Sequence, residues 1–128
     1  MNKTKYRFTV IAAVILGAIG CSLIRAAALA PKGYVIAEIT VTDAEAYKQY
    51  AAAVAPVVAK FGGKYIVRGG QTVAVEGDAP AGRIVVIEFV SLAAAQSFED
   101  SAEYQAVAAL RHKAARSRLF LVEGTAAP

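Results

Sequence analysis

The chain of 128 residues contains one cysteine and one histidine. The cysteine, Cys21, lies in an apolar N-terminal stretch, so the sequence that follows it has no thiol. This absence excludes an internal disulfide, a thiolate nucleophile and a cysteine-based metal site from the downstream domain. The single histidine, His112, argues against a strong transition-metal site and against a Ser-His-Asp constellation. We expect no metal and no cofactor.

Acidic residues are absent from the beginning of the chain, where none precedes Glu38. Four of the 14 basic residues lie in the first 25 positions, and the other ten are matched by ten acidic residues. The formal net charge of +4 therefore belongs to the N-terminal segment, and the remainder is neutral. A neutral domain lacks the basic footprint of nucleic-acid binding, so we expect no nucleic-acid partner.

The N-terminal segment has the anatomy of a secretory signal peptide. A positive stretch, Met1–Arg7, precedes the uncharged and mostly apolar Phe8–Ile24, and an Ala-x-Ala triplet follows at Ala28–Ala30. We therefore expect residues 1–30 to be a signal peptide or an N-terminal membrane anchor. Residues 31–128 are expected to form one domain.

Three fates of this leader remain open. Cleavage near residues 26–30 would release the domain, whereas retention of the apolar run would leave it anchored in a membrane. The residues before Cys21, Ala18-Ile19-Gly20, resemble a lipobox with an atypical first residue, and a lipobox would attach lipid to Cys21. Each fate exports the domain, so the predicted location is periplasmic or secreted, with membrane contact only through the N-terminal segment.

The remaining sequence contains four strand patterns. Period-two alternation predicts strands at Tyr34–Val41, Lys64–Arg68 and Arg118–Glu123. The run Arg83–Val90 is almost continuously apolar, which predicts a strand buried on both faces. After Gly69-Gly70 a second alternating run covers residues 72–76, so the paired glycines are expected to form a bulge before the strand continues.

Helical patterns separate these strands. Apolar residues spaced at three and four follow a capping box of Thr42 and Glu45, and Gly62-Gly63 ends this first helix. Ser91 and Ser101 are each expected to cap one of two further helical segments.

The order strand, helix, strand, strand, helix, strand is that of the ferredoxin-like βαββαβ arrangement, an α+β fold with one antiparallel sheet and its helices on one face. The helices cover only one face, yet the strand Arg83–Val90 is apolar on both. A second copy packed sheet against sheet is the simplest cover for the other face, so we expect a homodimer.

Several short motifs resemble the DUF1330 family, a family of domains of unknown function. The resemblance covers about residues 32–124 and rests on Tyr34–Glu38, Gly62–Tyr65, Val67–Gly70, Val86–Phe89, Ser101–Gln105 and Val122–Gly124. It implies a dimeric α+β barrel, related in shape to small monooxygenases and isomerases that work in the barrel cavity. It implies no established activity.

Strand parity identifies two candidate catalytic carboxylates. If the intervening apolar residues face the helices, Glu38 and Glu88 both point to the opposite face, where we expect a cavity, and Arg68 joins them if Tyr65 and Val67 pack inward. Two carboxylates in an apolar pocket raise one pKa, which suits general acid–base catalysis. The alternative is an Arg–Glu ion pair that fixes strand register.

Other residues are candidates for ligand binding, because Arg68 and the glycines after it offer a cation and backbone donors to an anion. The alternative for the tyrosines is a core role, and for His112 a contact with the helix dipole. The candidate ligand-binding residues are Arg68, Gly69, Gly70, Tyr34, Tyr104 and His112.

Three functions remain open at this point. The first is a dimeric module that binds a small organic ligand in each barrel cavity. The second is a cofactor-independent enzyme, similar to monooxygenases or isomerases, that uses the cavity carboxylates. The third is a purely structural dimer at the cell envelope.

Overall fold

The computed structural model describes residues 30–127, and the folded unit within them spans Pro31–Thr125. The predicted leader lies outside the described residues, apart from Ala30. Among the helices that are described, none is both long and apolar enough to cross a membrane. The elements in chain order are β1 (Gly33–Val41), α2 (Ala44–Lys60), β2 (Lys64–Arg68), β3 (Arg83–Phe89), α3 (Leu92–Asp100), α4 (Ala102–Ala114) and β4 (Ala115–Glu123).

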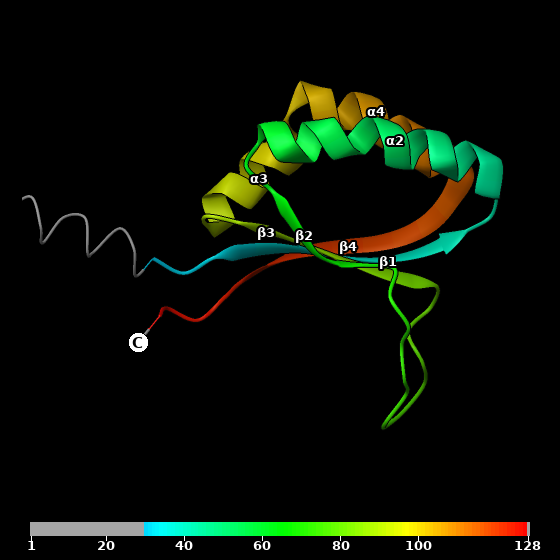
Figure 1. Cartoon of the computed structure of the whole chain (residues 1–128), viewed down its shortest axis with the longest axis horizontal. Coiled ribbons are helices and arrows are strands. Elements are labelled where there is room, and N and C mark those ends of the chain that lie inside the picture. The colour runs from blue at the N-terminus through cyan, green and yellow to red at the C-terminus, as the bar shows by residue number, and fades with distance from the viewer. Residues whose placement is uncertain (1–29, 128) are drawn as a thin grey trace, which may run out of the picture. The chain divides into compact units, whose positions relative to one another are not determined.

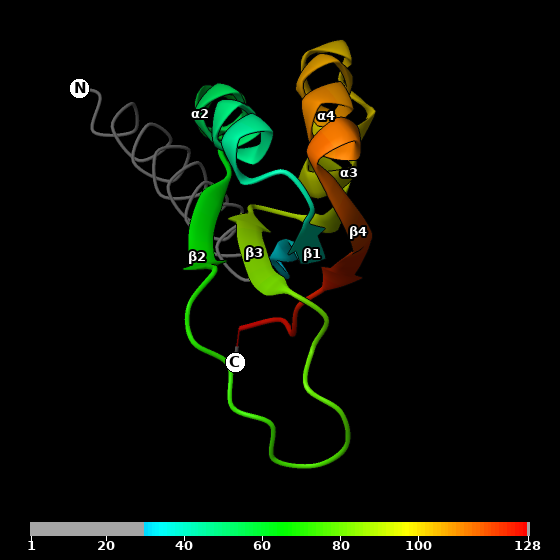
Figure 2. The same ribbon diagram turned by 90° about the vertical axis from the view of Figure 1, so that its right-hand side faces the viewer.

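The four strands form one antiparallel sheet in the order β2-β3-β1-β4 (Figure 2). The two central strands, β1 and β3, pair with Tyr34 opposite Glu88 and Ala37 opposite Val85. All three helices lie on one side of this sheet (Figure 1). The predicted α+β class with a ferredoxin-like arrangement is therefore confirmed, including strands one and three at the centre.

The core lies between the helices and the sheet. Alternate residues of β1, namely Val35, Ala37 and Ile39, face the helices and are at most 4% exposed. Burial of a large apolar side chain stabilises the fold by about 1.5–3 kcal/mol, so the alternation determines which face of each strand is covered. The other core residues are Tyr47, Tyr50, Val54, Val58, Val85, Ile87, Phe89, Ala95, Phe98, Tyr104, Ala108, Ala114 and Ala115.

Helix α2 begins one residue later than the predicted capping box implies. Asp43, not Thr42, is the N-cap, because its Oδ1 accepts a hydrogen bond from the amide of Ala46 at 3.0 Å. The amide of Thr42 instead donates to the carbonyl of Ala114 at 2.8 Å, which ties the start of α2 to the end of α4. The amide of Asp43 donates to the same carbonyl at 3.0 Å. Gly62 ends the helix as expected, with φ of +75°.

The predicted continuation of the second strand is wrong. Gly69 has φ of +71° and its amide donates to Ile84 at 2.7 Å, after which the chain leaves the sheet. Residues 69–82 form an exposed loop that extends away from the helices (Figures 1 and 2). The alternating run at 72–76 pairs with no strand of the described chain, and its valines are in solvent, Val73 at 75% and Val75 at 94% exposure. The bulge lies earlier, between Tyr65 and Val67.

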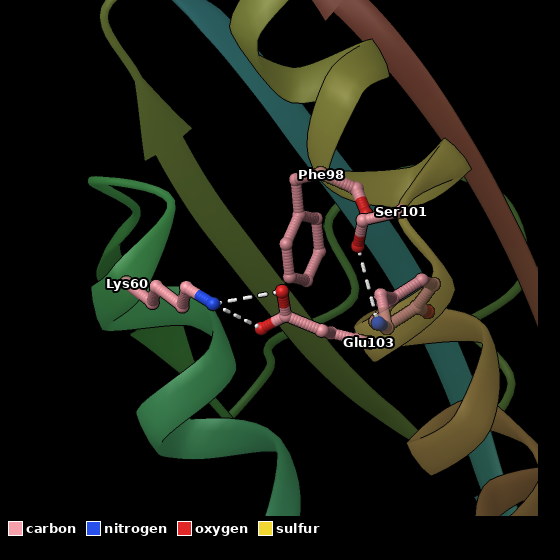
Figure 3. Close-up of polar contacts among 5 residues, drawn as sticks. Lys60, Phe98, Ser101 and Glu103 are labelled. Carbon is pink, nitrogen blue, oxygen red and sulfur yellow. Dashed lines mark hydrogen bonds and ion pairs between the residues drawn. The ribbon is translucent and has the colours of Figure 1, made fainter.

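The hydroxyl of Ser101 joins α3 to α4. It donates to the carbonyl of Phe98 at 2.7 Å and accepts from the amide of Tyr104 at 3.1 Å, so one side chain ends one helix and caps the next (Figure 3). Beside it, Lys60 contacts both carboxylate oxygens of Glu103 at 2.8 Å and links the end of α2 to the start of α4 (Figure 3). The predicted caps at Ser91 and Ser101 are confirmed.

Candidate functional site

A cavity lies between the helices and the sheet face that they cover. Its volume is about 40 Å³, counted as the space open to the centres of water molecules. Aliphatic side chains of β1 and β3 form its sheet wall, and four tyrosines, Tyr47, Tyr50, Tyr65 and Tyr104, form much of the rest. Three ionisable side chains also line it: Arg68, Arg83 and Glu99. We call it the tyrosine cavity.

The tyrosines are held by the helices and by each other. Tyr47 and Tyr50 are three residues apart on α2, so they share the face that packs on the sheet, and their ring centroids are 5.5 Å apart. Tyr104 stacks at 4.5 Å on Phe98 of the preceding helix. Burial raises the pKa of Tyr50, Tyr65 and Tyr104. Their hydroxyls therefore remain neutral hydrogen-bond donors at physiological pH.

Two arginines from neighbouring strands, Arg68 at the end of β2 and Arg83 at the start of β3, also line the cavity. Arg68 lies with its guanidinium 4.2 Å from the ring centroid of Tyr65, and Arg83 lies 5.3 Å from that of Tyr47. Cation–π contacts of this kind favour a fixed orientation of the guanidinium. Arg83 Nη2 also donates to the Arg68 carbonyl at 3.5 Å, but Arg83 Nε is buried and has no hydrogen-bond partner.

A second polar group surrounds Arg111, which is 5% exposed although it carries a charge. Its guanidinium donates to the hydroxyl of Tyr104 at 3.3 Å and to that of Ser117, and it lies 5.8 Å from the ring centroid of Tyr50. The Nε atom of Arg111 is buried without a partner. A buried cation with only neutral partners requires a nearby anion for compensation.

Glu99, which lines the cavity, is the acidic group on which the charge of Arg111 acts. Its Oε1 atom is buried and has no hydrogen-bond partner. Burial raises the pKa of Glu99 to about 7, although the charge of Arg111 and the Tyr104 hydroxyl act in the opposite direction. Near neutral pH this carboxyl exchanges between a neutral donor and an ionised acceptor, a property that suits acid–base chemistry or proton-coupled binding.

The two predicted catalytic carboxylates lie elsewhere. Glu38 and Glu88 point to the uncovered face of the sheet, as parity predicted, but they do not form one cluster in the chain. Register places them four residues apart along the sheet, roughly 13 Å at a rise of about 3.3 Å per residue. Glu38 contacts Arg118 at 2.7 Å, and Glu88 lies 3.5 Å from the hydroxyl of Tyr34. The ion-pair alternative thus describes Glu38, with Arg118 in the place of Arg68.

Arg68 lies on the opposite face from these glutamates, which corrects the predicted cluster. The register shift between Tyr65 and Val67 reverses the parity of the strand, so Tyr65 and Arg68 face the helices and Val67 faces away. Gly69 lies against the side chain of Arg83, so closely that a Cβ added at Gly69 would be 2.5 Å from Arg83 Nη2. Gly70 has open space around it. Arg68 therefore lines the tyrosine cavity, whereas the two glycines only border its arginine side.

The other three candidate ligand-binding residues also lie in different places, and only one of them lines the tyrosine cavity. Tyr104 is 3% exposed and lines the cavity. Tyr34 lies on the uncovered face beside Glu88. His112 is exposed in the last turn of α4, with Nε2 3.4 Å from Arg111, which agrees with the helix-dipole alternative. No cluster of three or more histidine, cysteine or acidic side chains suited to a metal ion occurs among residues 30–127.

The sequence did not identify Glu99, Arg111 and Arg83 as site residues. Glu99 and Arg111 lie in helices whose pattern leaves charged residues free to face solvent. Arg111 is buried in contact with Tyr50 of α2 and Ser117 of β4, and Glu99 is partly buried. One signal was present for Arg111: it follows Tyr104, Val107 and Ala108 at the spacing of the buried stripe.

Comparison with solved structures supports the fold. A protein of unknown function from Rhodopseudomonas palustris, RPA0582, superposes with a TM-score of 0.59 at 21% identity, over 83% of this chain and 94% of that one. The methylated form of RPA0582 gives a TM-score of 0.57 at 21% identity, over 82% and 89% of the two chains. No curated protein is similar enough to count as a match.

A family model matches nearly the whole folded unit. It is described as a domain of unknown function, DUF1330, and it covers residues 32–125. These residues include all seven described elements and every residue of the tyrosine cavity. The chain belongs to the DUF1330 family of domains of unknown function.

Proposed function

We propose that this chain is an exported, homodimeric domain that binds a small organic ligand in the tyrosine cavity. The observation that carries the proposal is the pair of buried polar atoms, Arg83 Nε and Glu99 Oε1, that lack hydrogen-bond partners on residues lining one cavity. Leaving such a group unsatisfied costs about 1–3 kcal/mol, and a bound molecule would supply the missing partners. Mostly apolar walls with a few polar groups are typical of small-molecule sites.

The ligand proposal is tested by filling the cavity from one wall. Ala51 lines it from α2, whereas the adjacent Ala52 is exposed. We expect fragment soaking and crystallography of the wild-type protein to give electron density for a small molecule in the cavity, with a raised melting temperature. Ala51→Leu should abolish both effects, and Ala52→Leu should preserve them. Ordered water alone in the wild-type cavity across a chemically diverse fragment set would contradict ligand binding and favour the structural alternative.

The homodimer rests on the face of the sheet that carries no helix. Three of its side chains, Val67, Phe120 and Val122, are 38–44% exposed, and Ile36, Ile84 and Val86 between them are only partly buried. A contiguous apolar surface of this kind marks an association site. A second copy is the fitting partner, since a twofold contact covers the same face on both chains. The dimer would also bury Glu38 with Arg118, and Glu88 with Tyr34, on either side of Ile36.

Export rests on the leader sequence, with its positive start, its apolar run and its small-residue triplet. The intact mass of the mature protein from its source tests this proposal. Loss of about 26–30 residues, or cleavage before Cys21 with added lipid, supports export. A full-length chain in the soluble fraction contradicts it.

An acid–base enzyme of the isomerase type is the second candidate, and Glu99 favours it. A carboxyl with a pKa of about 7 can remove a proton from the carbon beside a carbonyl group and return it elsewhere. The phenol of Tyr104 would donate to the enolate oxygen that forms. Exchange of such protons for deuterium, followed by NMR over a panel of small ketones and oxo acids in D₂O, tests this candidate. Exchange that Glu99→Gln abolishes supports it, and no exchange above the buffer rate contradicts it.

A further inference from the structure

The two unpartnered atoms belong to residues that line the tyrosine cavity from different elements, Arg83 from β3 and Glu99 from α3. In the β3-β1 pairing Arg83 lies opposite Ile39, and in the β1-β4 pairing Ile39 lies opposite Ser117. Ser117 is the hydroxyl that accepts from Arg111, whose charge acts on Glu99. Arg83 and Ser117 therefore lie on the two flanks of Ile39. Glu99 lines the same small cavity as Ile39 and Arg83, so one small molecule can contact both Arg83 and Glu99.

The charge of the lining selects the sign of this molecule. Arg68 and Arg83 are permanently cationic, and the carboxyl of Glu99 is the single acidic group among the lining residues. Arg111 adds a further cation behind Tyr104. Since this surrounding is positive, an anionic group is favoured next to the arginines, and a planar carboxylate matches the guanidinium geometry.

The size of the cavity limits the ligand further. A space of about 40 Å³ for water centres holds about three waters, which corresponds to roughly 90 Å³ of liquid volume. This volume fits a molecule of about five or six non-hydrogen atoms. Such a molecule has room for a carboxylate and one more polar group, and that group must satisfy Oε1 of Glu99.

The protonation state of Glu99 determines whether the second polar group of the ligand must donate or accept a hydrogen bond. The groups that act on Glu99 are Arg111 and Tyr104 from α4 and Asp100 from its own helix, with Arg68 and Arg83 lining the same cavity from the sheet. A bound anion opposes ionisation of Glu99, so the neutral acid is the form that coexists with it. A neutral carboxyl donates a hydrogen bond, and a carbonyl oxygen accepts it.

Building on the proposed ligand-binding function, we propose that the tyrosine cavity binds a short 2-oxo carboxylate together with a proton. The carboxylate of the ligand contacts Arg83 and Arg68, and its carbonyl oxygen accepts a hydrogen bond from protonated Glu99. A 2-oxo carboxylate is the smallest molecule that offers both groups within the available volume. Ionised Glu99 takes up the proton when the ligand binds, so affinity falls as pH rises through the range in which free Glu99 titrates.

Three probes of similar size separate the parts of this proposal by calorimetry. Pyruvate carries both groups, its amide pyruvamide lacks the charge, and propionate lacks the oxo group. We expect pyruvate to bind at least about tenfold more tightly than pyruvamide and several-fold more tightly than propionate, the ranges for a lost charged hydrogen bond and a lost neutral one. Equal affinity for pyruvate and pyruvamide, or for pyruvate and propionate, would overturn the proposal.

The proton is measured by repeating the pyruvate titration in buffers of different ionisation enthalpy. At pH 7.5 a group with a pKa of about 7 is roughly a quarter protonated, so binding should take up as much as about 0.75 of a proton. Glu99→Gln should still bind pyruvate, because its amide donates to the carbonyl, but without proton uptake. Uptake that persists in this variant, or none in the wild type, would overturn the role of Glu99.

Charge variants complete the test. Arg83→Gln should weaken pyruvate binding at least about tenfold, whereas Lys113→Gln, which removes an exposed charge from α4, should leave it unchanged. Thermal melts of each variant establish that it is folded before it is titrated. If neutral fragments occupy the cavity and pyruvate does not, this inference is wrong and the general ligand-binding function stands. If nothing occupies the cavity, both are wrong.

Discussion

Arg111 and Tyr104 lie seven residues apart on α4, about two helical turns, and the guanidinium of one donates to the hydroxyl of the other at 3.3 Å. The same guanidinium reaches Ser117 at the start of β4 and the ring of Tyr50 on α2. One buried cation thus connects two helices and a strand beside the tyrosine cavity.

Arg111→Met should lower the free energy of unfolding by about 2 kcal/mol. The substitution preserves much of the apolar stem but leaves two hydroxyls without their donor and removes the cation that favours ionisation of Glu99. Urea denaturation measures the loss. Lys113→Met on the exposed side of the same helix is the matched control, expected within about 0.5 kcal/mol of the wild type. Equal stability of the two variants would show that the Arg111 network is not stabilising.

Much of the fold was predictable because burial on one sheet face imposes a strict pattern. The buried residues Val35, Ala37 and Ile39 alternate with residues on the uncovered face of the sheet. A shift of the strand by one residue would turn all three to solvent. The caps at Ser91 and Ser101 depend only on neighbouring residues, so they too could be predicted. The cap of α2 could not, because Thr42 and Asp43 are neighbouring residues of types that both cap helices.

The site was less predictable for a physical reason. The bulge between Tyr65 and Val67 reverses the direction of every side chain after it, and nothing in the residues around Ile66 marks its position. The sequence therefore placed Arg68 in the predicted carboxylate cluster, whereas the residue lines the tyrosine cavity. The partial burial of Glu99 and its place in the cavity lining depend on tertiary packing, which local sequence does not determine.

The stability of the protein should depend on pH through Glu99. Its folded pKa of about 7 lies above the ordinary value of 4.5, so the folded state binds more protons than the unfolded state between these values. Stability from this group is fully present below about pH 4.5 and is lost as pH rises through 7. Allowing for solvent screening of a partly exposed side chain, we expect about 1–2 kcal/mol.

Glu99→Gln isolates this contribution, since every other titrating group is unchanged. Comparison of urea midpoints at pH 5 and pH 8.5 should give a difference between the wild type and the variant that grows in favour of the variant at the higher pH. A constant difference across this range would mean that Glu99 titrates with its ordinary pKa.

The uncovered sheet face should control oligomeric state. Phe120 lies near the centre of β4 and is 44% exposed, so Phe120→Glu places a charge where two copies would meet. We expect sedimentation velocity to give a dimer for the wild type and a monomer for the variant, because burying an unpaired charge opposes association. Ala52→Glu on the outer side of α2 is the control and should remain dimeric. A monomeric wild type would contradict the dimer directly.

Gly82 and Gly77 should differ sharply in their tolerance of a side chain, although both have φ of +75°. A Cβ at Gly82 would lie 2.2 Å from the carbonyl oxygen of Ile39, whereas a Cβ at Gly77 would meet no atom within 4 Å. Gly77→Ala therefore carries only the strain of the left-handed conformation, about 1 kcal/mol. Gly82→Ala adds a backbone clash at the point where the loop re-enters the sheet beside Arg83. We expect it to cost more than about 2 kcal/mol in chemical denaturation. Equal losses for the two variants would mean that the loop re-enters the sheet by another path.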